Sequence, residues 1–79
     1  MTATVAILGL AAPVAAEPSV GAYLAARQAR YDSDYEAEAK YFARVLASDP
    51  SNPAILESAL AAYLRIGDVE RALPLAQQI

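Results

Sequence analysis

Small apolar residues, most of them alanine, recur at helical spacing along four segments of this chain, and short polar turns separate the segments. Alanine has the highest helix propensity and lets helices approach closely, whereas the β-branched runs that strands require are missing. The chain has 79 residues, of which 57% are hydrophobic, so it has room for one small domain. We therefore predict an all-α fold of closely packed helices.

Turn signals set the bounds of four predicted helices, which cover residues 20–31, about 35–48, 53 to the turn at 66–68, and 69–79. The first turn contains Ser33 and Asp34, whose side chains can cap the following helix. Gly67 can take the left-handed geometry that ends a helix, and Asp68 can cap the last one. Pro74 lies inside that last segment, where we expect it to kink or delay the helix.

Each predicted helix carries one apolar stripe that indicates the side facing the core. The stripes are Ala22, Ala25, Ala26 and Ala29; Tyr35, Ala39, Phe42, Val45 and Leu46; Leu56, Ala59, Leu60 and Tyr63; and Ala72, Leu73, Ala76 and Ile79.

Shifting the chain by 34 residues superposes helix, turn and helix, and places Asp34 on Asp68 and Glu36 on Glu70. The second unit reads Leu56-x2-Ala59-Leu60-x2-Tyr63, then Gly67-Asp68, then Ala72-x3-Ala76. This pattern, with its period, resembles the tetratricopeptide repeat family over residues 19–79. The resemblance implies antiparallel helix pairs of an α-solenoid, about two units with the second incomplete.

Two residues depart from the family pattern, and the array lacks a cap. Ala22 replaces the bulky anchor of the first helix, and Glu38 takes a place that usually holds a small buried alanine. Either the first helix pair packs loosely there, or Ala39 takes the buried role. Because repeat units bury their faces on neighbours, we expect the front part of a longer array, with a covering partner or a second copy as the alternative.

The segment 1–16 differs from the rest of the chain because it is uncharged and apolar. The apolar stretch 3–12 is followed by Pro13 and by Val14-Ala15-Ala16, a small-residue cleavage pattern behind an h-region. The stretch is too short for a spanning helix of about 20 residues. We expect a signal peptide and an exported, periplasmic helical domain from 17 to 79, although the basic residue that normally opens a signal is missing. An apolar segment that caps the helices, or a retained membrane anchor, is the alternative.

The composition excludes the common kinds of catalytic and metal site. The chain has no Cys, His or Trp, so the common nucleophile–base pairs, zinc sites and disulfides are unavailable. A net charge of −3 gives no long-range attraction for nucleic acid or anionic lipid. We predict no enzyme activity, no metal and no cofactor, no nucleic-acid partner, and membrane contact only through 1–16. Self-association through an uncovered apolar face is expected.

The resemblance implies a concave groove lined by the first helix of each unit. Carried onto this chain, the groove residues are Tyr23, Arg27, Arg30 and Tyr31 with Glu57, Ala61, Leu64 and Arg65. Arginine binds carboxylates through two parallel hydrogen bonds, so this groove would suit an acidic peptide or a C-terminal carboxylate. Alternatively the arginines only solvate a helix face and the tyrosines pack against the preceding segment.

The carboxylates Asp34, Glu36 and Glu38 are explained by their place at a helix N-terminus, where the dipole favours acidic residues, better than by metal binding. We therefore expect a non-catalytic module for protein–protein interaction. A small membrane-anchored assembly subunit that retains residues 1–16 is the alternative function.

Overall fold

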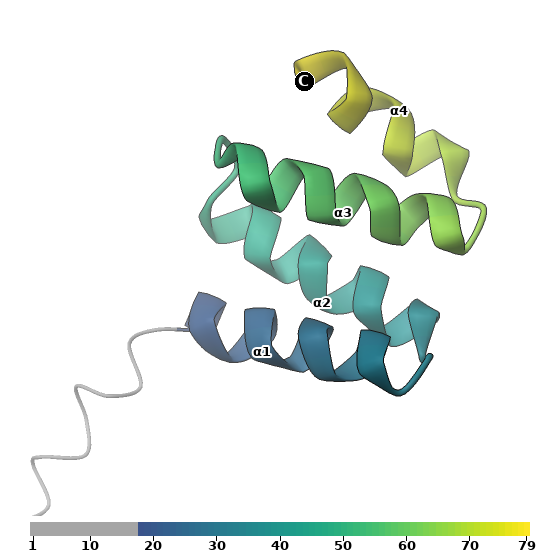
Figure 1. The fold of residues 1–79 in the computed structure, drawn as a ribbon. Coiled ribbons are helices and arrows are strands. Elements are labelled where there is room, and N and C mark those ends of the chain that lie inside the picture. Colours follow the sequence, from purple (N-terminus) through teal and green to yellow (C-terminus); the bar gives the residue numbers. More distant parts are fainter. Residues whose placement is uncertain (1–17) are drawn as a thin grey trace, which may run out of the picture.

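The structure is a computed structural model that describes residues 18–79, and every regular element in that range is an α-helix. The four helices are α1 (Pro18–Tyr31), α2 (Tyr35–Ser48), α3 (Pro53–Arg65) and α4 (Val69–Gln78). They stack in chain order, each packed against the next (Figure 1). Because short turns join them, neighbours run antiparallel. The prediction of an all-α fold is confirmed, whereas the predicted signal peptide at 1–16 lies outside the described residues.

Local capping explains where the helices begin. The side chain of Asp34 accepts a hydrogen bond from the Ala37 amide at 3.3 Å, and Asp68 accepts one from the Arg71 amide at 3.1 Å. Both bonds satisfy amides that have no partner within their own helix. The bounds of α2 agree with the prediction, α1 begins two residues earlier than 20, and α4 continues through Pro74.

The α1–α2 turn and the α3–α4 turn have the same geometry at places 34 residues apart. Ser33 and Gly67 take left-handed backbone angles, with φ of 61° and 75°. The amide after each of them donates back into the preceding helix, from Asp34 to the Ala29 carbonyl at 2.8 Å and from Asp68 to the Tyr63 carbonyl at 2.9 Å. The repeat seen in the sequence is therefore also a repeat of backbone hydrogen bonds.

The core forms where α2 packs between α1 and α3, and α4 adds a smaller contribution against α3. Its buried residues are Ala22, Ala26, Ala39, Phe42, Val45, Ile55, Leu56, Ala59, Ala62, Tyr63, Ala72 and Leu75. Burial raises the pKa of the Tyr63 phenol above its ordinary value, while nearby Arg71 lowers it and Asp68 raises it.

The predicted apolar stripe of α4 is wrong in part. Leu73 and Ile79 are 55% and 62% exposed, and Ala76 is exposed too, whereas Leu75 is buried. The reason is that α4 packs mainly against α3, so only the side with Ala72 and Leu75 is covered. No helix in the described range is both long enough and apolar enough to cross a bilayer.

Candidate functional site

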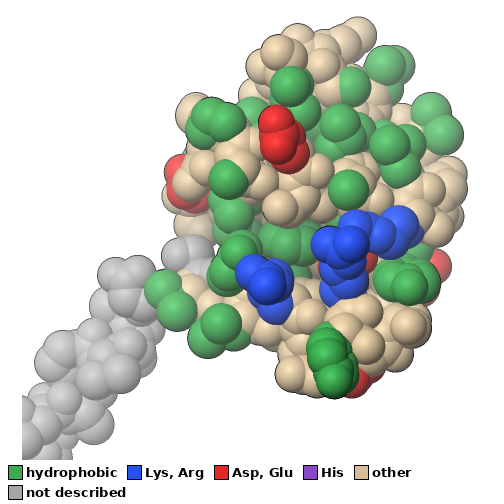
Figure 2. All heavy atoms as spheres, viewed as in Figure 1, with side chains coloured by type: hydrophobic (Ala, Val, Ile, Leu, Met, Phe, Trp, Pro, Cys, Tyr) green, Lys and Arg blue, Asp and Glu red, His purple; other side chains and the backbone are tan. Residues whose placement is uncertain are grey.

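A hollow of about 290 Å³ is lined by side chains of α1, α2 and α3. In the view of Figure 1, α2 lies behind α1 and α3. The lining residues of the hollow are Tyr23, Arg27 and Arg30 of α1, Glu38 and Phe42 of α2, and Glu57, Ser58, Ala61 and Arg65 of α3. Figure 2 shows basic side chains on both sides of a hydrophobic area on this face, with an acidic group above it. We call this feature the α1–α3 hollow.

Two packed aromatic rings form one side of the α1–α3 hollow. The rings of Tyr23 and Phe42 meet edge to face, with centroids 6.1 Å apart and planes at 72°. Arg27 lies over the Tyr23 ring, 5.8 Å from its centroid, and donates a hydrogen bond from Nη1 to the Tyr23 Oη at 3.0 Å. The guanidinium of Arg27 is thus held in place by an uncharged partner, and its positive charge stays available.

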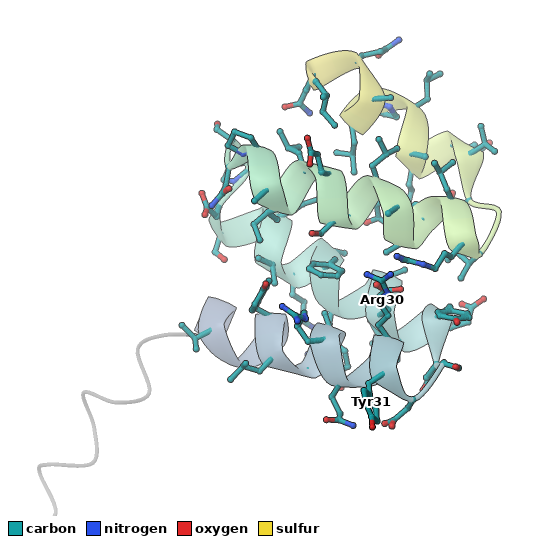
Figure 3. The ribbon with its side chains drawn as sticks, in the orientation of Figure 1. Arg30 and Tyr31 are labelled. Atoms are coloured by element: carbon teal, nitrogen blue, oxygen red, sulfur yellow. The ribbon has the colours of Figure 1, made fainter. Side chains whose placement is uncertain are left out.

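Arg30 stands one helical turn further along α1, and its side chain points toward α3 (Figure 3). It is exposed, and neither it nor Arg27 forms an ion pair with a carboxylate within residues 18–79. Two positive charges therefore face the hollow without a neutralising partner in the described part of the chain.

Arg65 differs from these two arginines because it is bound to a buried carboxylate. Its Nη1 donates to both oxygens of Glu38, at 3.1 and 3.2 Å. The Glu38 side chain is 1% exposed and that of Arg65 is 25% exposed. Burying a carboxylate without a partner would cost several kcal/mol of folding free energy. The ion pair with Arg65 compensates this cost for Glu38. The guanidinium also lies over Tyr35, 6.0 Å from the ring centroid.

The structure brings together six of the eight predicted groove residues: Tyr23, Arg27, Arg30, Glu57, Ala61 and Arg65. It does not place Tyr31 or Leu64 among the lining residues. Tyr31 is 86% exposed and points away from the hollow (Figure 3), and Leu64 is 55% exposed. Successive residues of an α-helix are about 100° apart. Tyr31 and Leu64 therefore cannot share the face of Arg30 and Arg65, their immediate neighbours.

Two lining residues on α2 were not predicted as part of a groove, because the sequence placed the groove on α1 and α3 only. Phe42 was assigned to the core, where it is indeed buried. Glu38 was attributed to the helix dipole together with Asp34 and Glu36, and that explanation is incomplete. The sequence did contain one sign that Glu38 is special: it is a charged residue at a place where the repeat pattern usually has a small buried one.

Glu38 and Ala39 are both buried, at 1% and 3% exposure, so Ala39 does not displace Glu38 from the interior. Asp34 caps α2, as expected from its position, and Glu36 is exposed. Within residues 18–79 no three acidic side chains come close enough to hold a metal ion. Chemically, the α1–α3 hollow offers three guanidinium groups as charged hydrogen-bond donors, of which that of Arg65 is bound to Glu38.

Comparison with known proteins gives no relative from which a function could be transferred: no family model, no curated protein and no solved structure matches this chain.

Proposed function

We propose that this chain is a non-catalytic interaction module of the tetratricopeptide type, and that its α1–α3 hollow binds an acidic peptide segment or a C-terminal carboxylate of a partner protein. The observation that carries the proposal is the convergence of Arg27 and Arg30 on one hollow, with no carboxylate partner for either among residues 18–79. Unpaired arginines that face a concave surface suit a carboxylate ligand.

The repeat supports the structural half of the proposal. Two helix pairs joined by turns with matching backbone angles at Ser33 and Gly67 are what a 34-residue helical repeat requires. Such repeats stack into curved arrays whose concave side binds other proteins. On this proposal, the concave side of the array would consist of α1 and α3.

The size of the hollow limits the ligand. A volume of about 290 Å³ lies at the small end of the range for ligand pockets, roughly 300–1,000 Å³. It can hold a carboxylate-bearing side chain or a chain end, whereas a whole cofactor would not fit. A bound peptide loses rotational and translational freedom, and a small contact area offsets this cost only in part. We therefore expect a single module to bind its ligand weakly.

Binding can be tested with a fluorescent peptide of alternating Glu and Ala that ends in a free carboxylate, followed by fluorescence anisotropy at low salt. We expect Arg30→Ala to weaken binding by about tenfold, since a hydrogen bond to a charged group contributes about 1.5–3 kcal/mol. A peptide with Gln in place of Glu and an amidated end should not bind.

Arg44→Ala is the matched control for this experiment. Arg44 is an exposed arginine on α2 that lies over Tyr41, 5.3 Å from the ring centroid, and it does not line the α1–α3 hollow. The Arg44→Ala substitution removes one positive charge from the domain, as Arg30→Ala does. If Arg44→Ala weakens binding as much as Arg30→Ala, attraction is general rather than local and the proposed site is wrong.

A further inference from the structure

Glu38 is unusual among the residues around the α1–α3 hollow. It is a carboxylate with 1% exposure in a hollow whose other charged residues are three arginines and Glu57. Both of its oxygens bind the same nitrogen, Nη1 of Arg65. Among residues 18–79 no other hydrogen bond reaches the Glu38 carboxylate, and none is donated by the other guanidinium nitrogens of Arg65.

Stability gives a poor explanation for this pair. A buried ion pair is often no more stabilising than apolar side chains of the same volume, because desolvation of both charges offsets their attraction. The neighbouring positions of α2 that face the core are apolar, Ala39 and Phe42. An apolar residue would therefore serve packing at position 38 as well as Glu does.

The effect of Glu38 on the hollow is direct. The Glu38 carboxylate already binds Arg65, so a ligand carboxylate would have to compete for that guanidinium. Its negative charge would also repel a carboxylate bound in the hollow. In a partly buried site such charges interact strongly, because little water screens them. Glu57 adds a second negative charge at the rim. Only Arg27 and Arg30 remain fully available.

We propose that Glu38 is an internal competitor of the ligand: it occupies Arg65 and lowers the affinity of the α1–α3 hollow for carboxylates. This inference rests on the proposed function of that hollow. In the free protein Glu38 neutralises Arg65, and a bound carboxylate either shares that guanidinium or relies on the other two arginines. Glu38 thereby sets how strongly the module binds acidic partners.

The opposite role, in which Glu38 positions Arg65 for the ligand, is weaker on this geometry. Arg65 is also restrained by the Tyr35 ring, 6.0 Å from its guanidinium, and by the last turn of α3, from which it projects. It does not depend on Glu38 alone for its position. The two roles predict opposite signs for the effect of removing the charge of Glu38.

The test is Glu38→Gln in the full chain, titrated with the fluorescent Glu–Ala peptide. This substitution keeps the volume of the side chain and one oxygen that accepts from Arg65, but removes the negative charge. We expect binding about fivefold tighter or more than that of the unsubstituted protein, as expected for removal of a repulsive charge from a partly buried site. Glu36→Gln makes the same change of charge two residues away on an exposed face outside the hollow, and should change binding less than about twofold.

The outcomes separate the two proposals. If the unsubstituted protein binds the peptide in an Arg30-dependent way but Glu38→Gln binds equally well or more weakly, Glu38 is not a competitor, although the hollow is the binding site. If the peptide does not bind at all, or Arg30 has no effect, both proposals are wrong. Should circular dichroism show that Glu38→Gln does not fold, Glu38→Met fills the same space with an apolar side chain and must give the same gain in affinity.

Discussion

The two helix pairs share a turn geometry and a 34-residue period, yet they bury different sides of their second helices. Helix α2 lies between α1 and α3, so Ala39 is 3% exposed, whereas the equivalent Leu73 of α4 is 55% exposed because α3 is the neighbour that packs against it. Tyr35 and Val69, also equivalent, are 39% and 63% exposed. The same pattern of residues therefore leads to a core helix or to a surface helix, depending on how many neighbours cover it.

The two ion pairs of the structure also differ in burial. Glu38 of α2, in the first helix pair, is buried and reaches across to Arg65 of α3, in the second helix pair, at 3.1 Å. In the second pair Arg71 and Asp68 lie within one turn of α4, 3.6 Å apart, with the Arg71 side chain 69% exposed. Breaking the buried Glu38–Arg65 pair should therefore cost much more stability than breaking the exposed Arg71–Asp68 pair, which water screens.

The largest effect should come from the core of the first pair. Phe42 is 3% exposed and packs edge-on against Tyr23, so Phe42→Ala should destabilise the fold by about 3–5 kcal/mol. Leu75→Ala, in a helix that packs mainly against α3, should cost about 2 kcal/mol. Urea denaturation followed by circular dichroism measures both values. Equal losses would mean that α4 is as well covered as α2, against the exposure of Leu73.

A smaller effect is expected at the two ion pairs. Arg65→Ala leaves Glu38 buried without a partner and should cost about 3 kcal/mol, the lower end of the range for breaking a buried pair because Arg65 keeps some contact with water. Arg71→Ala should cost less than about 1 kcal/mol, as exposed pairs do. The same denaturation experiment compares them. If both substitutions cost the same, the burial of Glu38 does not determine the strength of its pair.

The helices could be predicted from sequence because local signals fix their ends. Asp34 and Asp68 act as caps, and α2 has the predicted bounds. The pairing of Glu38 with Arg65 could not be predicted, since it joins residues 27 positions apart and depends on how α2 and α3 pack. The resemblance placed Arg27, Arg30 and Arg65 correctly at the α1–α3 hollow, whereas Tyr31 and Leu64 each lie one residue away from the residues that line it.

The smallest expected effect lies at the two turns, where the same backbone angle is taken by different residues. Gly67→Ala should destabilise by about 1 kcal/mol, because φ of 75° is strained for a residue with Cβ; nothing lies within 4 Å of that Cβ, so no clash adds to the strain. Ser33→Gly should have the opposite sign and relieve the strain at φ of 61°. The gain should be only about 0.5 kcal/mol, because glycine also gives the unfolded chain more freedom. Urea midpoints of the two variants measure these shifts, and a loss of stability in Ser33→Gly would mean that the two turns are not energetically equivalent despite their shared geometry.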